Sequence, residues 1–181
     1  DILIVGADGK PERPWMTSVI DDYSRAICGY TVFTGAPSAI NTALALRQAI
    51  WRKSDPAWPM CGLPDVLHID HGSDFTSQHI EYTAVALKIR LIYSTVGRPQ
   101  GRGKVERFFG TVSTELLAAL PGHLAPGARR PKPHLTLAEL DQALIIEPRE
   151  VAYLDVTKQE AWAMYEGADM GGQTDIEIKA I

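Results

Sequence analysis

The chain has 181 residues, of which 45% are hydrophobic and 22% charged, the balance of a globular protein with room for one well-packed domain. Its net charge of −4 argues against a protein that coats DNA by charge alone, and no apolar run approaches the roughly 20 residues that cross a bilayer, so we expect no membrane partner. Cys28 and Cys61 form no CxxC pair, which argues against a zinc site or a disulfide framework and fits a reducing cytoplasm.

The first third of the chain predicts β structure and then a helix. It opens on Asp1 with no Met, basic start or cleavage signal, which favours an excised fragment. Residues 1–5 predict a strand and 6–14 a turn-rich link. Residues 15–20 and 26–33 flank a polar corner and predict a hairpin, so we expect three consecutive antiparallel strands. A helix should follow over 37–53, with one apolar stripe made of Ala39, Ala43, Leu46 and Ile50.

The middle of the chain alternates strands and helices. After a Pro- and Trp-containing loop (54–64), residues 65–70 predict a buried strand, 76–87 a helix, 89–93 a strand and 94–103 a glycine-rich loop. A long helix should run over 104–120, with Glu106, Gly110 and Ser113 opposite its apolar face. That apolar face consists of Val105, Phe108, Phe109, Val112, Leu116 and Leu120.

The last third is less regular. Thr136 with Glu139 and Thr157 with Glu160 have the Thr-x-x-Glu pattern of a helix capping box. The residues after Gly167 suggest loose structure. The whole order of elements predicts an α/β fold with a mixed sheet and helices on its faces.

Two carboxylates could carry chemistry. Asp70 ends a predicted strand, where ligands of such sheets gather, and Glu106 lies in the first turn of the long helix. Two carboxylates sharing a site would repel unless a divalent cation lay between them, and hard oxygen ligands suit Mg²⁺ or Mn²⁺. Spacing alone leaves this open, because an arbitrary Asp and Glu usually serve as a cap and a surface charge.

The motifs around these residues resemble the catalytic core of DDE transposases and retroviral integrases. Asp70-His-Gly-Ser-Asp-Phe is followed, after thirty-five intervening residues, by Glu106 within Gly103-Lys-Val-Glu-Arg-Phe-Phe-Gly-Thr. The stretch Arg13-Pro-Trp-Met-Thr-Ser-Val-Ile-Asp-Asp-Tyr-Ser-Arg, ending in Ile27-Cys-Gly-Tyr, is similar to bacterial transposases of the phage-Mu type. The resemblance covers residues 1–122, which we interpret as the core, with 123–181 as a linker and C-terminal extension.

The resemblance implies a ribonuclease-H-like fold with a five-stranded mixed sheet, and a DDE-type polynucleotidyl transferase that cuts and joins DNA strands. Asp70 and Glu106 would be catalytic and would bind two Mg²⁺ (or Mn²⁺) ions, with His71 and Asp74 in supporting roles. The partners would be transposon ends, target DNA, further copies of the chain and accessory transposition proteins. The expected location is the bacterial cytoplasm, at the nucleoid.

The chain departs from the family pattern at two places. His71 stands where members usually have Asn, and it could hydrogen-bond or tune metal affinity. The first Asp of the triad lies, in relatives, on a strand a few residues before the position of Asp1, so we expect it upstream of this chain. Asp21 and Asp22 are poor substitutes, because they lie at a hairpin corner where Asp is a turn residue.

Several other polar residues have both a functional and a structural interpretation. Asp74 could cap the following helix instead of backing up a metal, and His68 is expected to be a packed histidine. The tryptophans are expected to be core or loop anchors. Four cations flank Glu106 and could contact the DNA backbone, or could be a solvated face: Arg98, Arg102, Lys104 and Arg107.

Two other functions remain open. One is a non-catalytic DNA-binding or oligomerisation module that keeps the ribonuclease-H-like fold. The other is a nuclease of the same fold that only hydrolyses. An acidic residue on the upstream strand would favour the enzyme over the non-catalytic module. Strand-transfer products would favour the transposase over the nuclease.

Overall fold

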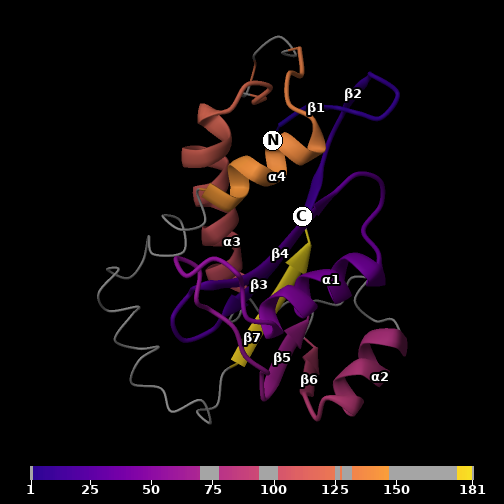
Figure 1. Cartoon of the computed structure of the whole chain (residues 1–181), viewed down its shortest axis with the longest axis vertical. Helices are drawn as coiled ribbons and strands as arrows, with labels where there is room; N and C mark the ends of the chain where they lie inside the picture. Colours follow the sequence, from indigo (N-terminus) through magenta and orange to yellow (C-terminus); the bar gives the residue numbers. More distant parts are fainter. Residues whose placement is uncertain are drawn as a thin grey trace.

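The computed structural model describes residues 2–69, 78–93, 102–124, 127, 132–146 and 175–180, with the backbone alone at 102–106, 145–146 and 175–180. A sheet of five strands in the order β4-β3-β7-β5-β6 forms its centre (Figure 1). Strands β3 (Trp15–Asp21) and β4 (Ile27–Phe33) are antiparallel, while β5 (Val66–Ile69) runs parallel to both β6 (Arg90–Tyr93) and β7 (Asp175–Ala180). A mixed α/β sheet is therefore present, as the order of elements predicts, but one of its strands comes from a part of the chain where no strand was predicted.

That strand is β7, at the centre of the sheet. It pairs antiparallel with β3, from Thr17–Ala180 to Asp21–Ile176, and parallel with β5, from Val66–Asp175 to Ile69–Ile178. The sequence suggested loose structure here. Its alternation of Asp, Ile, Glu and Ile is nevertheless a strand pattern, and a slot between two strands satisfies both edges of its backbone.

The N-terminal residues do not join this sheet. Strand β1 (Ile4–Val5) pairs with β2 (Pro11–Glu12) in a separate two-stranded sheet. The Leu3 N–H donates to Gly122 O at 2.9 Å and the Val5 N–H to Leu135 O at 2.8 Å. The expectation of three consecutive antiparallel strands was thus wrong, because the backbone of 2–5 bonds to later loops and to β2 instead.

Helix α1 (Ala39–Ile50) covers one face of the sheet and packs closely on β4. It buries Thr42, Ala45, Leu46 and Ala49. Of the predicted stripe, Leu46 is therefore confirmed and Ile50 packs against the core, whereas Ala43 is exposed. The small side chains face the sheet because Gly29 lets the helix backbone approach. Two larger apolar residues of the helix, Ile40 and Leu44, are exposed.

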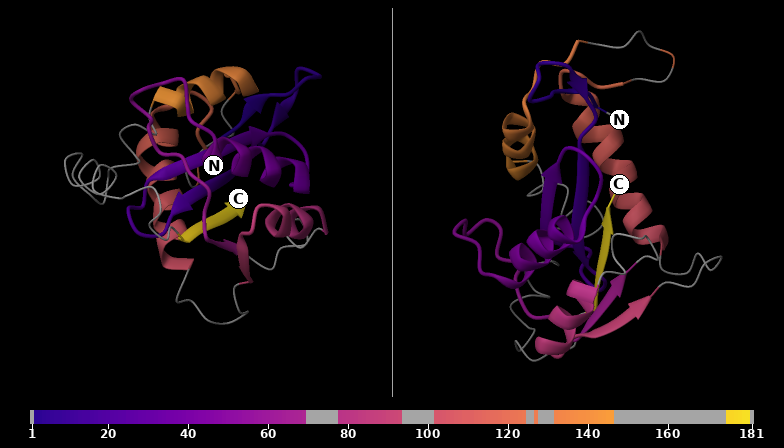
Figure 2. Two further views of the ribbon diagram at one scale, coloured as in Figure 1. Left: turned by 60° about the horizontal axis from the view of Figure 1, so that its bottom comes forward. Right: turned by 90° about the vertical axis from the view of Figure 1, so that its right-hand side faces the viewer.

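The opposite face of the sheet is covered by α4 (Leu137–Ile146) and by the helix that starts with α3 (Arg102–Thr111), as Figure 2 shows from the side. Tyr30 belongs to the face opposite Gly29, since neighbouring strand residues alternate, and its hydroxyl donates to Asp141 O of α4 at 3.3 Å. The Thr136–Glu139 capping box at the start of α4 is confirmed: the Thr136 N–H donates to Glu139 Oε2 at 2.8 Å and the Glu139 N–H to Thr136 Oγ1 at 3.3 Å. The Thr136 hydroxyl also donates to Glu139 Oε2 at 2.8 Å, and the two bonds that this carboxylate accepts from Thr136 lower its pKa.

The long predicted helix is not uniformly α-helical. After α3 the chain forms a π-helical turn, η1 (Val112–Leu116), and a 3₁₀ turn, η2 (Leu117–Ala119). The Thr114 hydroxyl donates to Gly110 O at 3.0 Å, the kind of side-chain bond that bends a helix. Val112 and Leu116 are buried and Phe108 packs on the core, so this part of the predicted apolar face is confirmed.

The loop after α1 (51–65) is held on the start of β4. The Trp58 indole N–H donates to Ile27 O at 2.6 Å, and its ring stacks on Tyr30 at 5.8 Å. Lys53 Nζ donates to Cys28 O at 2.5 Å and to Met60 O. Trp58 is thus a loop anchor, as predicted, whereas Trp51 is 61% exposed and belongs neither to the core nor to an anchor.

Both cysteines in the described ranges are free thiols, and no helix there is long and apolar enough to span a bilayer.

Candidate active site

The candidate site lies where β5 and β6 end. Strand β5 is held between two parallel neighbours and ends at Ile69, which is 1% exposed. Its short apolar run is typical of a strand covered on both faces. Asp70 is the next residue in the sequence and lies outside the described residues, as do His71 and Asp74. The described part of this strand therefore ends one residue before the predicted catalytic position.

Glu106 belongs to α3, which is described here by its backbone. In the right-hand view of Figure 2, the arrowheads of β5 and β6 point toward the first turns of this helix. The rings of Phe108 and Phe109 lie edge to face with their centroids 5.1 Å apart, and Phe108 packs against the core. These contacts fix the helix two residues beyond Glu106. The described backbone thus gives the end of β5 at Ile69 and the helix α3 that contains Glu106.

A tyrosine that sequence reasoning missed lies at the same edge. Tyr93 ends β6 and is the register partner of Ile69 in β5. Its hydroxyl donates to Glu81 Oε1 of α2 (Gln78–Ala86) at 2.8 Å. Burial raises the pKa of Tyr93, and the Glu81 carboxylate raises it further, so the phenol stays protonated as a donor. The only sequence signal was an aromatic residue at the end of a strand.

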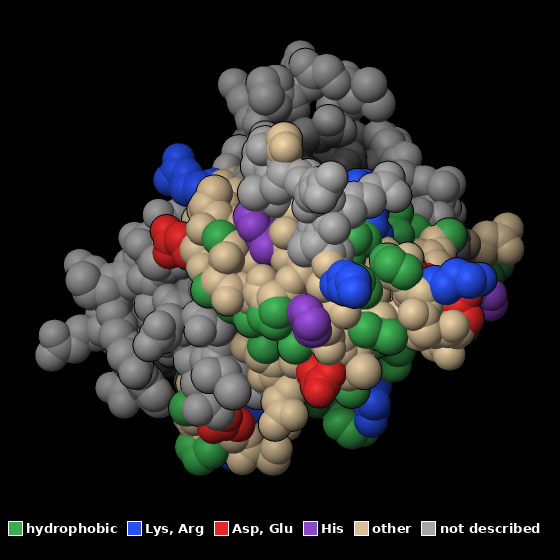
Figure 3. Space-filling view, turned by 90° about the horizontal axis from the view of Figure 1, so that it is seen from above, with side chains coloured by type: hydrophobic (Ala, Val, Ile, Leu, Met, Phe, Trp, Pro, Cys, Tyr) green, Lys and Arg blue, Asp and Glu red, His purple; other side chains and the backbone are tan. Residues whose placement is uncertain are grey.

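The predicted DNA-binding cations lie along the same helix. Arg102 and Lys104 belong to the backbone of α3, Arg107 is exposed on it, and Arg98 lies outside the described residues. On the face seen in Figure 3, the coloured Lys and Arg side chains stand singly among neutral and hydrophobic ones. The described residues of that face therefore form no broad basic patch.

Asp21 is a structural residue of the β3–β4 turn. It is 4% exposed, and its Oδ2 accepts the backbone N–H of Ser24 at 2.7 Å and the Ser24 hydroxyl at 2.5 Å. Its register partner is Ile176, which pairs with Leu67 on the other side, so Asp21 lies at a different level of the sheet from the end of β5. The prediction that it is a turn residue is confirmed.

A divalent metal would suit the predicted donors. Two carboxylates are the hard oxygen ligands that Mg²⁺ and Mn²⁺ prefer. Within the described ranges no three His, Cys, Asp or Glu residues cluster as a metal site.

The fold is that of integrase catalytic cores, a ribonuclease-H-like fold. The chain superposes on the catalytic core domain of BIV integrase with a TM-score of 0.53 at 22% identity, over 84% of this chain and 85% of that one. It superposes on the HTLV-2 integrase catalytic core domain, solved in complex with magnesium in a dimeric form, with a TM-score of 0.52 at 16% identity, over 93% and 92% of the two chains. Likenesses at such identities describe the fold alone.

Two relatives by sequence are transposition proteins. The chain is 55% identical over 124 residues to the transposase for transposon Tn552 of Staphylococcus aureus, covering 68% of this chain and 26% of the relative. It is 30% identical over 145 residues to the Tn7 transposition protein TnsB of Escherichia coli, covering 74% of this chain and 20% of the relative. The chain thus spans about a quarter or less of these relatives.

The family profile described as the TnsB C-terminal domain matches residues 1–122, the range over which the sequence motifs carry the resemblance. The chain therefore belongs to the TnsB C-terminal domain family, a family of transposases.

Proposed function

We propose that this chain is the catalytic core of a DNA transposase that cuts transposon ends and joins them to target DNA. The observation that supports the proposal is that β5 ends at Ile69, the residue before Asp70, and that α3 contains Glu106. The 55% identity to the Tn552 transposase supports the reaction class.

Asp70 and Glu106 would hold one or two divalent ions. Such ions supply neutralisation of charge at the phosphate and activation of an oxygen nucleophile. The role of the two carboxylates would be to hold these ions in fixed positions, so that a phosphodiester is aligned for in-line attack. His71 and Asp74 would orient the first carboxylate from its own loop. We also assign residues 1–122 to the core and 123–181 to an extension. The proposed location is the bacterial cytoplasm at the nucleoid, where the protein acts as an oligomer on DNA with accessory transposition proteins. We assign it to the phage-Mu-type subgroup of transposases.

The test is Mn²⁺-dependent strand transfer from pre-cut element ends. The family resemblance assigns the first carboxylate of the triad to a strand upstream of Asp1, so the chain is compared with a version extended through that strand. We expect Asp70→Asn and Glu106→Gln to lower transfer by at least about a hundredfold in the active version while circular dichroism stays unchanged, because an amide is a poor ligand for a hard cation.

Asp65→Asn and Glu115→Gln are the matched controls. Both positions are exposed carboxylates, at the start of β5 and on η1. They should leave transfer unchanged. Full activity of Asp70→Asn would contradict the proposal. Hydrolysis without joining would favour the nuclease, and a folded, Mn²⁺-binding but inactive extended version would favour the non-catalytic module.

A further inference from the structure

The outer edge of β4 is an edge of the main sheet and is only partly closed. In an antiparallel strand, the N–H and C=O of one residue point to the same side of the strand, and this side alternates from each residue to the next. The Tyr30 N–H donates to the Gln48 side-chain carbonyl at 2.6 Å, so Tyr30 faces away from β3. Cys28 does the same, because its C=O accepts Lys53 Nζ. Side chains thus occupy part of the edge, a common protection against unwanted pairing.

Farther along the strand the edge is open. Val32 has the same parity as Tyr30 and lies beyond the register shift, which is between Val19 and Ile20. No residue in the described part of the chain bonds the Tyr30 C=O or either backbone group of Val32 outside the pairing of β3 with β4. Three adjacent backbone groups are therefore available to an added strand.

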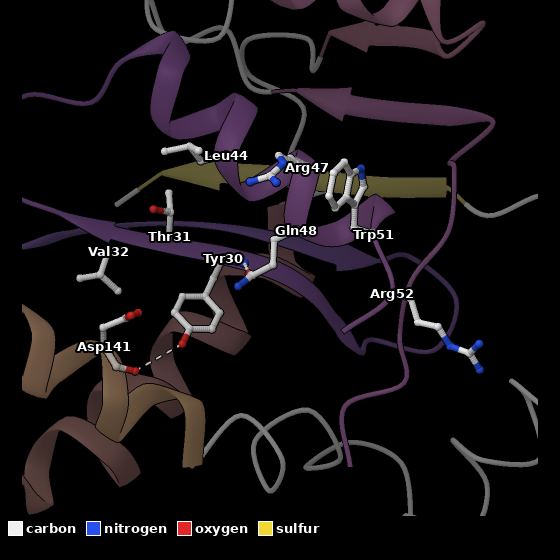
Figure 4. Close-up of a pocket in the computed structure, with 9 residues that line it drawn as sticks. All are labelled: Tyr30, Thr31, Val32, Leu44, Arg47, Gln48, Trp51, Arg52 and Asp141. Carbon is white, nitrogen blue, oxygen red and sulfur yellow. Dashed lines mark hydrogen bonds between the residues drawn. The ribbon is translucent and has the colours of Figure 1, made fainter. Parts of the chain in front are cut away.

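A groove of about 380 Å³ lies over this open segment. Figure 4 shows β4 along its floor, with Leu44, Arg47, Gln48 and Trp51 of the α1 side on one flank and Asp141 of α4 on the other. Both flanks are well supported, because α1 packs on β4 and the Tyr30 hydroxyl bonds Asp141 O. A hollow of this shape matches an extended peptide in contact with the strand edge.

The flank formed by α1 is basic and apolar. Trp51 is 61% exposed and Leu44 46% exposed, and the Arg47 guanidinium lies 4.3 Å from the centre of the Trp51 ring. Arg52 adds a second cation to the lining. The exposed apolar residues on α1 follow from the tight packing at Gly29, which turned small residues inward. Acidic side chains alternating with apolar ones would meet complementary chemistry here.

We propose that the open edge of β4 binds an extended acidic segment of a partner protein by β-strand addition. The backbone of the segment pairs with Tyr30 and Val32, and its acidic side chains lie toward Arg47 and Arg52. The Asp141 carboxylate on the other flank favours a segment whose opposite face is neutral. This site lies on an edge formed by β4 and is independent of the strand-transfer proposal.

The probe is a fluorescein-labelled hexapeptide of alternating Glu and Val, capped at both ends, and its binding is followed by fluorescence anisotropy. We expect the Arg47→Glu/Arg52→Glu variant to bind at least about tenfold more weakly, as for the loss of two charge pairs at a partly exposed site. Arg90→Glu, an exposed charge on β6 at the other edge of the sheet, is the matched control and should leave binding unchanged.

Two changes test the backbone pairing itself. A peptide N-methylated at alternate residues keeps all its charges but has no donors at those positions, and we expect its binding to fall about tenfold. Val32→Pro removes the outward N–H at an edge position where proline is tolerated, and should have the same effect. If Val32→Pro fails to fold, the binding of the methylated peptide still tests the backbone pairing.

Equal binding of the methylated peptide would overturn strand addition and leave a charge contact only. Absence of binding up to about 1 mM peptide would overturn the proposal as well. Competition by a short DNA duplex that is insensitive to Val32→Pro would assign the groove to nucleic acid instead. Loss of strand transfer in Asp70→Asn with unchanged peptide binding would show the two sites to be separate.

Discussion

At the scale of single residues, Gly29 sets the distance between the sheet and α1. A Cβ at this position would lie 2.5 Å from Ala45 O and 2.6 Å from Ala49 N, and both are backbone atoms that cannot move without the helix. The same contact decides which face of α1 is buried. The sequence shows an ordinary glycine in a strand, and only the packing reveals that no other residue fits.

Gly29→Ala is therefore expected to lower the free energy of unfolding by about 1–3 kcal/mol, because the helix must move away from β4. Urea denaturation followed by circular dichroism measures the change. Gly110→Ala is the control: no atom lies within 4 Å of its added Cβ, and the residue is exposed in α3. That change should stabilise by about 0.5–1 kcal/mol, since glycine is a poor helix former. Equal stability of Gly29→Ala and the parent would contradict the close contact.

At the scale of elements, β7 completes the sheet. Without it β3 and β5 would each present an unpaired edge, because β7 has register partners on both, from Asp21 to Thr17 and from Val66 to Ile69. A strand placed last in the chain thus holds together the hairpin β3–β4 and the parallel pair β5–β6. The candidate site depends on it, since β5 is positioned between β7 and β6.

Ile178→Pro should destabilise the fold by about 3 kcal/mol or more, because proline removes a donor in a central strand and disrupts the ladder. Ile178 pairs with Val19 on one side and Ile69 on the other. Hydrogen exchange at the amides of β3 and β5 would report the loss of protection. Ile178→Val keeps the donor and the branched side chain and should change little. Unchanged protection in the proline variant would place β7 outside the sheet.

At the scale of the whole molecule, the proposed binding of DNA by an acidic chain requires a local concentration of cations. The net charge is −4, and the described surface in Figure 3 carries its cations singly. The predicted DNA-binding residues are instead gathered between Arg98 and Arg107, next to Glu106. Sequence-independent affinity should therefore come from this stretch and should weaken with salt.

Changing Arg98, Arg102 and Arg107 together to Glu is expected to weaken binding to a random duplex. The slope of log K against log salt should also become shallower, by about 0.9 for each DNA phosphate that the variant no longer neutralises. Fluorescence anisotropy at several salt concentrations measures both. Lys10→Glu/Arg90→Glu, two exposed cations elsewhere, should leave the slope nearly unchanged. A slope that stays the same in the triple variant would rule out this face as the DNA-binding surface.

The sequence by itself determined the class of fold, the hairpin, α1, β5, α2, β6, the start of α3 and the capping box of α4, because each carries a local periodic or capping pattern. It also determined the family, through motifs at fixed spacing around Asp70 and Glu106. Tertiary structure alone decided that residues 2–5 leave the main sheet, that 175–180 enter it, and that α1 turns its small residues inward. These three features depend on which strand edges remain unpaired and on how closely Gly29 lets the backbones of β4 and α1 approach. No local sequence pattern predicts either property.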